Sequence, residues 1–202
     1  MGFFGWEVVG KVPDVPRYVV IAAPHTSNWD LPYMLGCAYI LGFDASWIGK
    51  HTLFKGAKGR FYTWLGGIPI DRTVKKDQVQ QIVDHIRGVE RIALAIAPEG
   101  SRSRQKYWKS GFYYIAMRAE VPIVLGFLDY KRKRGGFGPI LTPSGDLDRD
   151  VAIIRDFYAD ISGRYPENFS NIAFRPETEH KERPPRRGRV KAFLHGLGWL
   201  KA

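Results

Sequence analysis

The sequence contains a single cysteine, Cys37, among its 202 residues. One cysteine cannot form a disulfide within the chain, and it excludes a metal site built from several cysteines. Scarce cysteine is also typical of reducing compartments. We therefore expect a cytoplasmic protein.

Long apolar runs are missing as well. The longest uncharged stretch, Leu31 to Phe43, is shorter than the roughly 20 apolar residues that a membrane-spanning helix needs. The N-terminal MGFFGWEVVG has no basic residue before its apolar positions and no small-residue cleavage site, so it does not resemble a secretory signal. Trp6 stands where N-myristoylation needs Ser or Thr. We expect no membrane-spanning segment, only peripheral contact with a membrane.

Acidic residues are too few to balance the basic ones. Lys and Arg number 31 against 20 Asp and Glu, which gives a formal net charge of +11. A charge of this sign favours an anionic partner, whether nucleic acid, phospholipid surface or phosphorylated substrate. A basic nucleic-acid-binding protein is thus one alternative. No helix-turn-helix, zinc-finger or RNA-recognition pattern supports it, and we expect no nucleic acid partner.

Short apolar runs alternate with helical patterns along most of the chain. Several runs are apolar on both faces, which is typical of parallel strands covered by helices on both sides. Apolar residues at helical spacing predict helices over Asp77–Glu90 and Asp150–Arg164, and KRKRGGFG at 131–138 predicts an exposed turn between two strands. We expect an α/β fold, a single domain with a largely parallel central sheet flanked by helices. The predicted strands are Arg17–Ala23, Ala45–Gly49, Ile68–Ile70, Ile92–Ala97 and Pro122–Leu128.

The composition changes near Pro176. We expect residues 1–176 to form the domain, and residues 177–202 to form a basic, Pro-rich linker followed by an amphipathic C-terminal segment. That segment is suited to lying on an anionic membrane surface, helped by the aromatic N-terminus, although its apolar stripe could instead belong to the core. The stripe consists of Val190, Phe193, Leu194, Leu197 and Leu200.

The block APHTSNWD directly follows the predicted strand that ends at Ala23. Loops at the carboxyl ends of parallel strands are where open α/β sheets bind ligands, so His25 is placed to face a crevice. Asp30, five residues later, can accept a hydrogen bond from one imidazole nitrogen and leave the other to act as a base. Taken alone, the pair has an equally good structural interpretation in which Asp30 caps a helix and His25 fills a turn.

Two more polar blocks follow predicted strands, GGIPIDR and APEGSRSR. The planar guanidinium of arginine suits phosphate because it donates two parallel hydrogen bonds, and hydroxyl and carboxylate groups beside it could hold a polyol phosphate. Each block alone could also be a plain surface turn or solvated loop. The segment VPIV at 121–124 has no reactive group and is expected in the core. The candidate binding residues are Asp71, Arg72, Glu99, Gly100, Ser101 and Arg102.

Together and in this order, the blocks resemble the glycerolipid acyltransferases, the family typified by bacterial 1-acylglycerol-3-phosphate acyltransferase. HTSNWD is similar to the HxxxxD block of that family, GGIPIDR to the second block, PEGSRS to the EGTRS block and VPIV to the fourth. Lys109, Gly111 and Ala116 resemble the lysine-glycine-alanine helix that follows the third block. The resemblance runs from about His25 to Val124, half of the chain.

The resemblance implies transfer of a fatty acyl group from acyl-CoA or acyl carrier protein to a hydroxyl of a lysophospholipid or glycerophosphate-like acceptor. It implies that His25 is the general base, that Asp30 orients it, and that the six binding residues line the acceptor site. The thioester is a co-substrate, and no metal or other cofactor is expected. Backbone N–H groups near Gly66 and Gly67, or at a helix start, are candidates for stabilising the oxyanion.

The sequence departs from the family pattern at several positions. Pro24 stands where the family usually has asparagine, Ala97 where it often has phenylalanine, and Ser101 replaces threonine. Members commonly carry longer hydrophobic N-terminal segments than the 24 residues that precede His25 here. A non-catalytic, lipid-binding relative with the same fold is therefore a further alternative.

Overall fold

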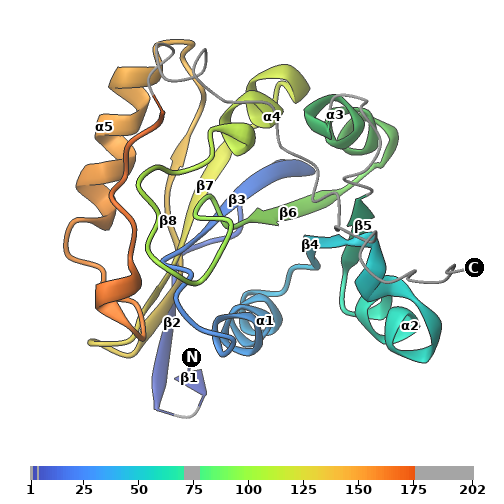
Figure 1. The fold of residues 1–202 in the computed structure, drawn as a ribbon, viewed down its shortest axis with the longest axis horizontal. Helices are drawn as coiled ribbons and strands as arrows, with labels where there is room; N and C mark the ends of the chain where they lie inside the picture. Colours follow the sequence, from blue (N-terminus) through green and yellow to red (C-terminus); the bar gives the residue numbers. More distant parts are fainter. Residues whose placement is uncertain (1, 4, 71–77, 176–202) are drawn as a thin grey trace, which may run out of the picture.

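The computed structural model describes residues 2–3, 5–70 and 78–175 of the chain. Its centre is an eight-stranded sheet with the strand order β1-β2-β8-β7-β3-β6-β4-β5 (Figure 1). The five predicted strands are all present as β3 to β7, and β1, β2 and β8 are additional. The strands are β1 Gly2–Phe3, β2 Trp6–Val9, β3 Arg17–Ala23, β4 Ala45–Lys50, β5 Gly67–Ile70, β6 Ile92–Ile96, β7 Ile123–Asp129 and β8 Arg134–Leu141.

Five neighbouring strands, from β7 through β3, β6 and β4 to β5, run parallel to one another. β8 is antiparallel to β7, β2 is parallel to β8, and β1 is antiparallel to β2 at the edge. The prediction of a largely parallel α/β sheet is confirmed. This arrangement brings the carboxyl ends of the parallel strands to one edge of the sheet.

The segment 131–138 forms a shorter turn than the sequence predicts, because Arg134 already begins β8. The glycines fit in this strand because the backbones of neighbouring strands approach it too closely for side chains. Gly136 has φ +134°, and a side chain at this position would collide with the backbone of Val9 in β2. The absence of side chains therefore lets β8 fit between β7 and β2.

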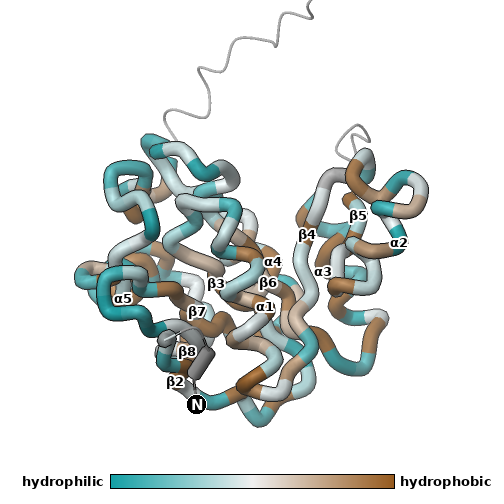
Figure 2. Tube along the Cα trace, turned by 90° about the horizontal axis from the view of Figure 1, so that it is seen from below, coloured by the Kyte–Doolittle hydropathy of each residue, from teal (hydrophilic) through white to brown (hydrophobic). Residues whose placement is uncertain are grey.

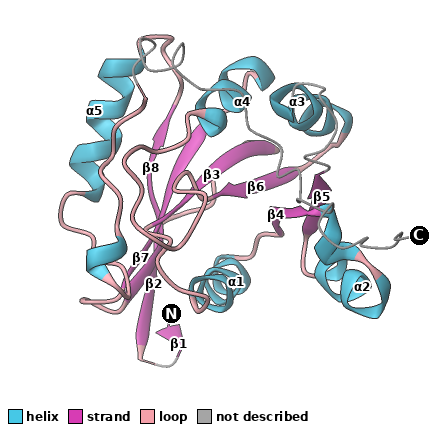
Figure 3. Ribbon diagram, in the orientation of Figure 1, coloured by secondary structure: helices cyan, strands magenta, loops and turns pink. Residues whose placement is uncertain are grey.

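Helices cover both faces of the sheet, as Figure 3 shows. Alternate residues of β3 face opposite sides: Val19 and Ile21 pack with α3, α4 and α5, whereas Tyr18 and Val20 lie on the side of α1. Among the described residues, no helix combines the length and apolarity needed to cross a membrane. The helices are α1 Asp30–Leu41, α2 Gly56–Trp64, α3 Gln78–Gly88, α4 Gly111–Ala119 and α5 Leu147–Tyr158, with short 3-10 helices η1 His51–Phe54 and η2 Pro166–Asn168.

The predicted helix over Asp77–Glu90 corresponds to α3, whose Ile82, Val83 and Ile86 are buried. The helix predicted from Asp150 starts earlier, at Leu147, because the Asp146 side chain caps it by accepting a hydrogen bond from the backbone N–H of Arg149 at 3.1 Å. It also ends earlier, at Tyr158. The predicted tail, residues 177–202, lies outside the described residues, so the domain boundary at 176 stays a prediction.

The strand register brings three loops together at the carboxyl edge. In the centre of the sheet β3 lies between β6 and β7, with Ile21 opposite Ile96 and Ala23 opposite Phe127. The loops that leave these three strands therefore emerge side by side, although they are far apart in the sequence.

Candidate active site

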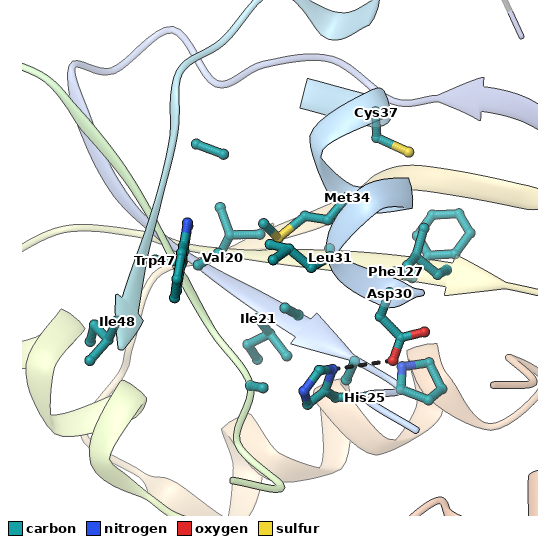
Figure 4. Close-up of a pocket in the computed structure, with 18 of the residues that line it drawn as sticks. Val20, Ile21, His25, Asp30, Leu31, Met34, Cys37, Trp47, Ile48 and Phe127 are labelled. Atoms are coloured by element: carbon teal, nitrogen blue, oxygen red, sulfur yellow. Dashed lines mark ion pairs between the residues drawn. The ribbon is translucent and has the colours of Figure 1, made fainter. Parts of the chain in front are cut away.

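His25 and Asp30 face each other across the loop that joins β3 to α1. The imidazole Nδ1 lies 3.2 Å from Asp30 Oδ2, as Figure 4 shows. The backbone N–H groups of Thr26 and Ser27 each donate to the same oxygen at 2.9 Å. Asp30 is the first residue of α1, and its carboxylate turns back to this loop instead of capping the helix. The backbone of this loop thus holds the Asp30 carboxylate in position beside His25.

A third residue, Tyr130, completes this arrangement from the far end of β7. Its hydroxyl donates a hydrogen bond of 2.8 Å to Asp30 Oδ1. Burial, followed by the hydrogen bond to Asp30, raises the pKa of the Tyr130 phenol far above its usual range. The hydroxyl therefore stays protonated and acts as a donor. Tyr130 is not among the predicted site residues, although its position close after a predicted strand was an available signal.

The two members of the pair differ in exposure. The Asp30 side chain is 7% exposed and the His25 side chain is 24% exposed. Both residues line the same cavity, and the acid is the more deeply buried of the two. With Nδ1 facing the carboxylate, Nε2 is the nitrogen that remains for proton transfer.

Glu99 lies directly behind His25. Its carboxyl Oε1 accepts a hydrogen bond of 2.6 Å from the backbone N–H of His25, and Oε2 accepts one of 3.2 Å from the Ser170 hydroxyl. Glu99 is 1% exposed. This burial raises the pKa of the Glu99 carboxyl, while the hydrogen bonds from His25 and Ser170 oppose the shift. Glu99 thus anchors the histidine backbone from within the protein.

The cavity beside His25 lies between the sheet and α1 and has a volume of about 530 Å³. Its walls are mainly apolar, and Figure 4 shows Leu31 and Met34 of α1 on one side with Val20 and Trp47 from the strands. The His25–Asp30 pair lies at one end of this space. Apolar walls with a few polar groups at one end are typical of a site for a ligand with a long apolar part.

The model of the Acyltransferase family matches residues 8–124, which is more than half of the chain. The chain belongs to this acyltransferase family. The structure is also similar to the crystal structure of the 1-acyl-sn-glycerophosphate (LPA) acyltransferase PlsC from Thermotoga maritima. That likeness has a TM-score of 0.50 and 19% identity over 78% of this chain and 73% of the other, and it supports the fold. No curated protein matches the chain.

The residues of the third block, PEGSRS, lie in two different environments. Gly100 and Arg102 line the cavity, and Arg102 is exposed. The Ser101 hydroxyl instead contacts its own loop, where it bonds to Ser103 and accepts from the Gln105 amide at 2.9 Å. Glu99 was expected to line the acceptor site, but it lies behind His25 and does not line the cavity. The turn explains this division, because Gly100 has φ +68° and redirects the chain toward solvent.

Lys109 is a second residue that the structure places beside this block. A side chain added at Gly100 would collide with that of Lys109, so the glycine leaves room for the lysine next to the cavity wall. Lys109 was predicted only as part of the helix that resembles the family pattern, and not as a site residue. The end of the lysine side chain therefore lies against Gly100, which lines the cavity.

The second block, GGIPIDR, is only partly covered by the described residues. Asp71 and Arg72 lie outside the described residues, so their role at the acceptor site stays a prediction. Gly66 and Gly67 are at the amino end of β5, which runs parallel to β4, β6 and β3. Through the pairs Gly67–Trp47, Trp47–Ala95 and Ala95–Val20, Gly67 lies level with the middle of β3 and three strands away from it. Neither glycine lines the cavity beside His25 in the described part of the chain, and the hypothesis that they stabilise the oxyanion is wrong. Within the described residues, no group of three or more His, Cys, Asp or Glu is placed to hold a metal ion.

Proposed function

We propose that this acyltransferase moves a fatty acyl group from an acyl-CoA or acyl carrier protein thioester to a hydroxyl of a lysophospholipid or glycerophosphate-like acceptor. The supporting observation is the buried-acid pair, His25 with Asp30, at the end of an apolar cavity of about 530 Å³. The cavity can shield an acyl chain from water while the thioester carbonyl remains beside the imidazole.

The chemistry needs one base and no covalent enzyme intermediate. His25 Nε2 takes the proton of the acceptor hydroxyl as that oxygen bonds to the thioester carbonyl carbon. Asp30 stabilises the imidazolium that forms. When the C–S bond breaks, the departing thiolate takes the proton from Nε2, which returns the histidine to its neutral form. Base catalysis of this kind contributes about 10²–10⁴-fold, and the mechanism assigns no step to a metal or other cofactor.

The acceptor phosphate is assigned to Arg102, which lines the cavity. A guanidinium on the cavity wall can donate two parallel hydrogen bonds to a phosphate. Asp71, Arg72 and Ser101 are assigned to the same acceptor from the family resemblance. The name of the Thermotoga maritima protein, an acyltransferase for 1-acyl-sn-glycerophosphate, supports an acceptor of this class and a role in phospholipid biosynthesis.

Substrates of this kind reside in or beside a membrane, so we place the enzyme at the cytoplasmic face of an anionic membrane, as a peripheral protein. Basic residues are drawn to such a surface. The stripe of residues 190–200 with its basic neighbours is one proposed contact. Of the N-terminal aromatic residues, Trp6 does not contribute to this contact, because it is only 5% exposed and packs against Tyr33 and Tyr130.

The test measures transfer of a labelled acyl group from acyl-CoA and from acyl carrier protein to a panel of lysophospholipids and glycerol 3-phosphate. We expect His25→Ala to lose transfer by about 10²-fold or more, with its thermal melting unchanged. His85→Ala, at an exposed position of α3, is the matched control and should remain active. Turnover retained in His25→Ala would overturn the mechanism, and lipid binding without turnover in the wild-type protein would favour the non-catalytic relative.

A further inference from the structure

Helix α2 presents two neighbouring aromatic side chains to solvent. Phe61 is 55% exposed and Trp64 is 78% exposed, and their ring centroids are 6.0 Å apart. Residues three apart lie on the same side of a helix, so the two rings form one patch. Single exposed apolar side chains are ordinary, whereas adjacent large ones indicate an interaction surface.

The opposite side of α2 is fixed to the protein. Tyr62 packs against Phe54 and Trp47, with ring centroids 6.3 and 5.9 Å apart. The Trp47 indole N–H donates to the Leu65 carbonyl at 2.9 Å. A side chain at Gly59 would collide with the backbone of Phe54, so the helix lies close against η1. The outward direction of Phe61 and Trp64 is therefore set by packing on the inner side.

The same part of the chain has charge of one sign only. Residues 45–70 contain Lys50, Lys55, Lys58 and Arg60 and no Asp or Glu. Lys55, Lys58 and Arg60 are exposed. Basic residues beside exposed aromatic rings are the combination found where proteins rest on anionic lipid headgroups.

The 3-10 helix against which α2 packs, η1, contributes a residue to the cavity of the active site. Leu53, in η1, is 45% exposed and at the same time lines the cavity. Figures 1 and 2 place α2, with β4 and β5, at one edge of the molecule, away from α5. An apolar chain that leaves a lipid layer at this edge thus meets Leu53 before the deeper cavity walls.

We propose that the α2 surface, defined as Leu53, Phe61 and Trp64 with Lys55, Lys58 and Arg60, docks on an anionic phospholipid surface. Phe61 and Trp64 insert at the level of the headgroups, where aromatic side chains are favoured, and the basic residues contact lipid phosphates. We assign this patch to a lipid surface because its basic residues match anionic headgroups and because η1, beside α2, lines the cavity that would take the acyl chain. The proposal rests on the proposed function for the link between docking and acyl entry.

Two measurements on the full chain test the surface directly. The first is binding to vesicles of equal parts phosphatidylglycerol and phosphatidylcholine, compared between wild type, the double variant Phe61→Ser with Trp64→Ser, and Tyr39→Ser. Tyr39 is 89% exposed on α1 and serves as the matched control. We expect about tenfold or greater weakening in the double variant and none in the control. Equal binding by all three proteins would overturn the proposal.

The second measurement is quenching of tryptophan fluorescence by vesicles of the same composition with brominated acyl chains. Trp64→Phe keeps the apolar side chain but removes the reporter, so it should bind the vesicles and lose most of the quenching. Equal quenching in wild type and Trp64→Phe would overturn the proposal and assign the contact to another segment, such as the C-terminal residues with Trp199.

Activity separates this proposal from the proposed function. The double variant should transfer acyl groups to glycerol 3-phosphate in solution as the wild type does, and lose transfer to lysophospholipid embedded in vesicles. Vesicle binding through α2 without any acyl transfer by the wild type would contradict the proposed function and leave the docking surface standing. A raised KM for acyl carrier protein with unchanged vesicle binding would instead make the surface a carrier docking site and overturn the proposal.

Discussion

The Tyr130 hydroxyl donates a hydrogen bond of 2.8 Å to Asp30 Oδ1, while the other oxygen of this carboxylate lies 3.2 Å from His25 Nδ1. The two residues are 100 positions apart in the sequence. The carboxylate is thus held from both sides, by the loop that carries His25 and by the loop after β7. Tyr130 is in our interpretation a positioning residue that acts through Asp30.

Replacing Tyr130 by phenylalanine tests this role. The ring should keep its edge-to-face contact with Trp6, at 4.9 Å between centroids, while the donor is lost. Hydrogen bonds to charged groups contribute about 1.5–3 kcal/mol, and we expect about a tenfold decrease in kcat with little change in KM for either substrate. Tyr39→Phe is the control at an exposed position. An unchanged kcat and pH profile in Tyr130→Phe would show that the loop alone holds Asp30.

Glu99→Gln should change how stability depends on pH. Burial raises the pKa of Glu99 in the folded protein above its ordinary value of 4.5. The contribution of Glu99 to the stability of the folded state is therefore complete below pH 4.5 and is lost as pH rises through the raised folded pKa. The free energy of unfolding of the wild type should therefore fall relative to that of Glu99→Gln as pH rises above 4.5, by about 1.4 kcal/mol for each unit of the pKa shift, and its melting temperature should fall with it.

Thermal melts of the two proteins across this pH range measure the effect. Glutamine can still accept from the His25 backbone N–H, so Glu99→Gln should retain activity that Glu99→Ala loses. Glu167→Gln, at an exposed position, is the control. Parallel melting curves for wild type and Glu99→Gln at all pH values would contradict the assignment.

Arg102→Lys should weaken binding of the acceptor and leave binding of the acyl donor unchanged. Lysine keeps the charge but cannot donate two parallel hydrogen bonds to one phosphate. Losing one charge-assisted bond, about 1.5 kcal/mol, predicts roughly a tenfold rise in acceptor KM. Arg104→Lys is the matched control, since Arg104 contacts Asn171 at 3.5 Å and does not line the cavity among the described residues. An equal rise in donor KM would instead assign Arg102 to the thioester donor.

Met34→Trp should shorten the acyl chain that the enzyme accepts. Met34 extends from α1 into the cavity (Figure 4), so a larger side chain there reduces the apolar space. We expect kcat/KM to fall for long-chain donors and to stay near the wild-type value for short ones. Tyr39→Trp adds bulk to the same helix outside the cavity and should leave the chain-length profile unchanged. A uniform loss across all donors would indicate overpacking of the fold, which costs about 1–3 kcal/mol.

Some of this architecture follows from local patterns, and some does not. The strand Arg17–Ala23 was predicted with its observed bounds, because apolar residues on both of its faces signal a strand between two layers. A strand was predicted after the turn at 131–138, but its start at Arg134 was not, since the glycines of β8 lack strand propensity and are explained only by the neighbouring backbone of β2. Pairing partners far away in the sequence decide such a segment.

The same division holds for the site. His25 and Asp30 could be predicted because both lie in one loop, five residues apart. The inward direction of Glu99 could not, because the sequence does not reveal which way a side chain turns after a strand ends. Tyr130 depended on β3 and β7 being neighbours, which is a property of the sheet order and not of either segment.

The register of β6, β3 and β7 has a consequence for how activity arises. Glu99, His25 and Tyr130 each follow a different one of these strands, and they meet only when all three pair in parallel. Parallel pairings join distant segments and form slowly, because the intervening loops must close first. The site is therefore assembled late, and recovery of acyl transfer on refolding should report completion of the central sheet, whereas helical signal returns earlier.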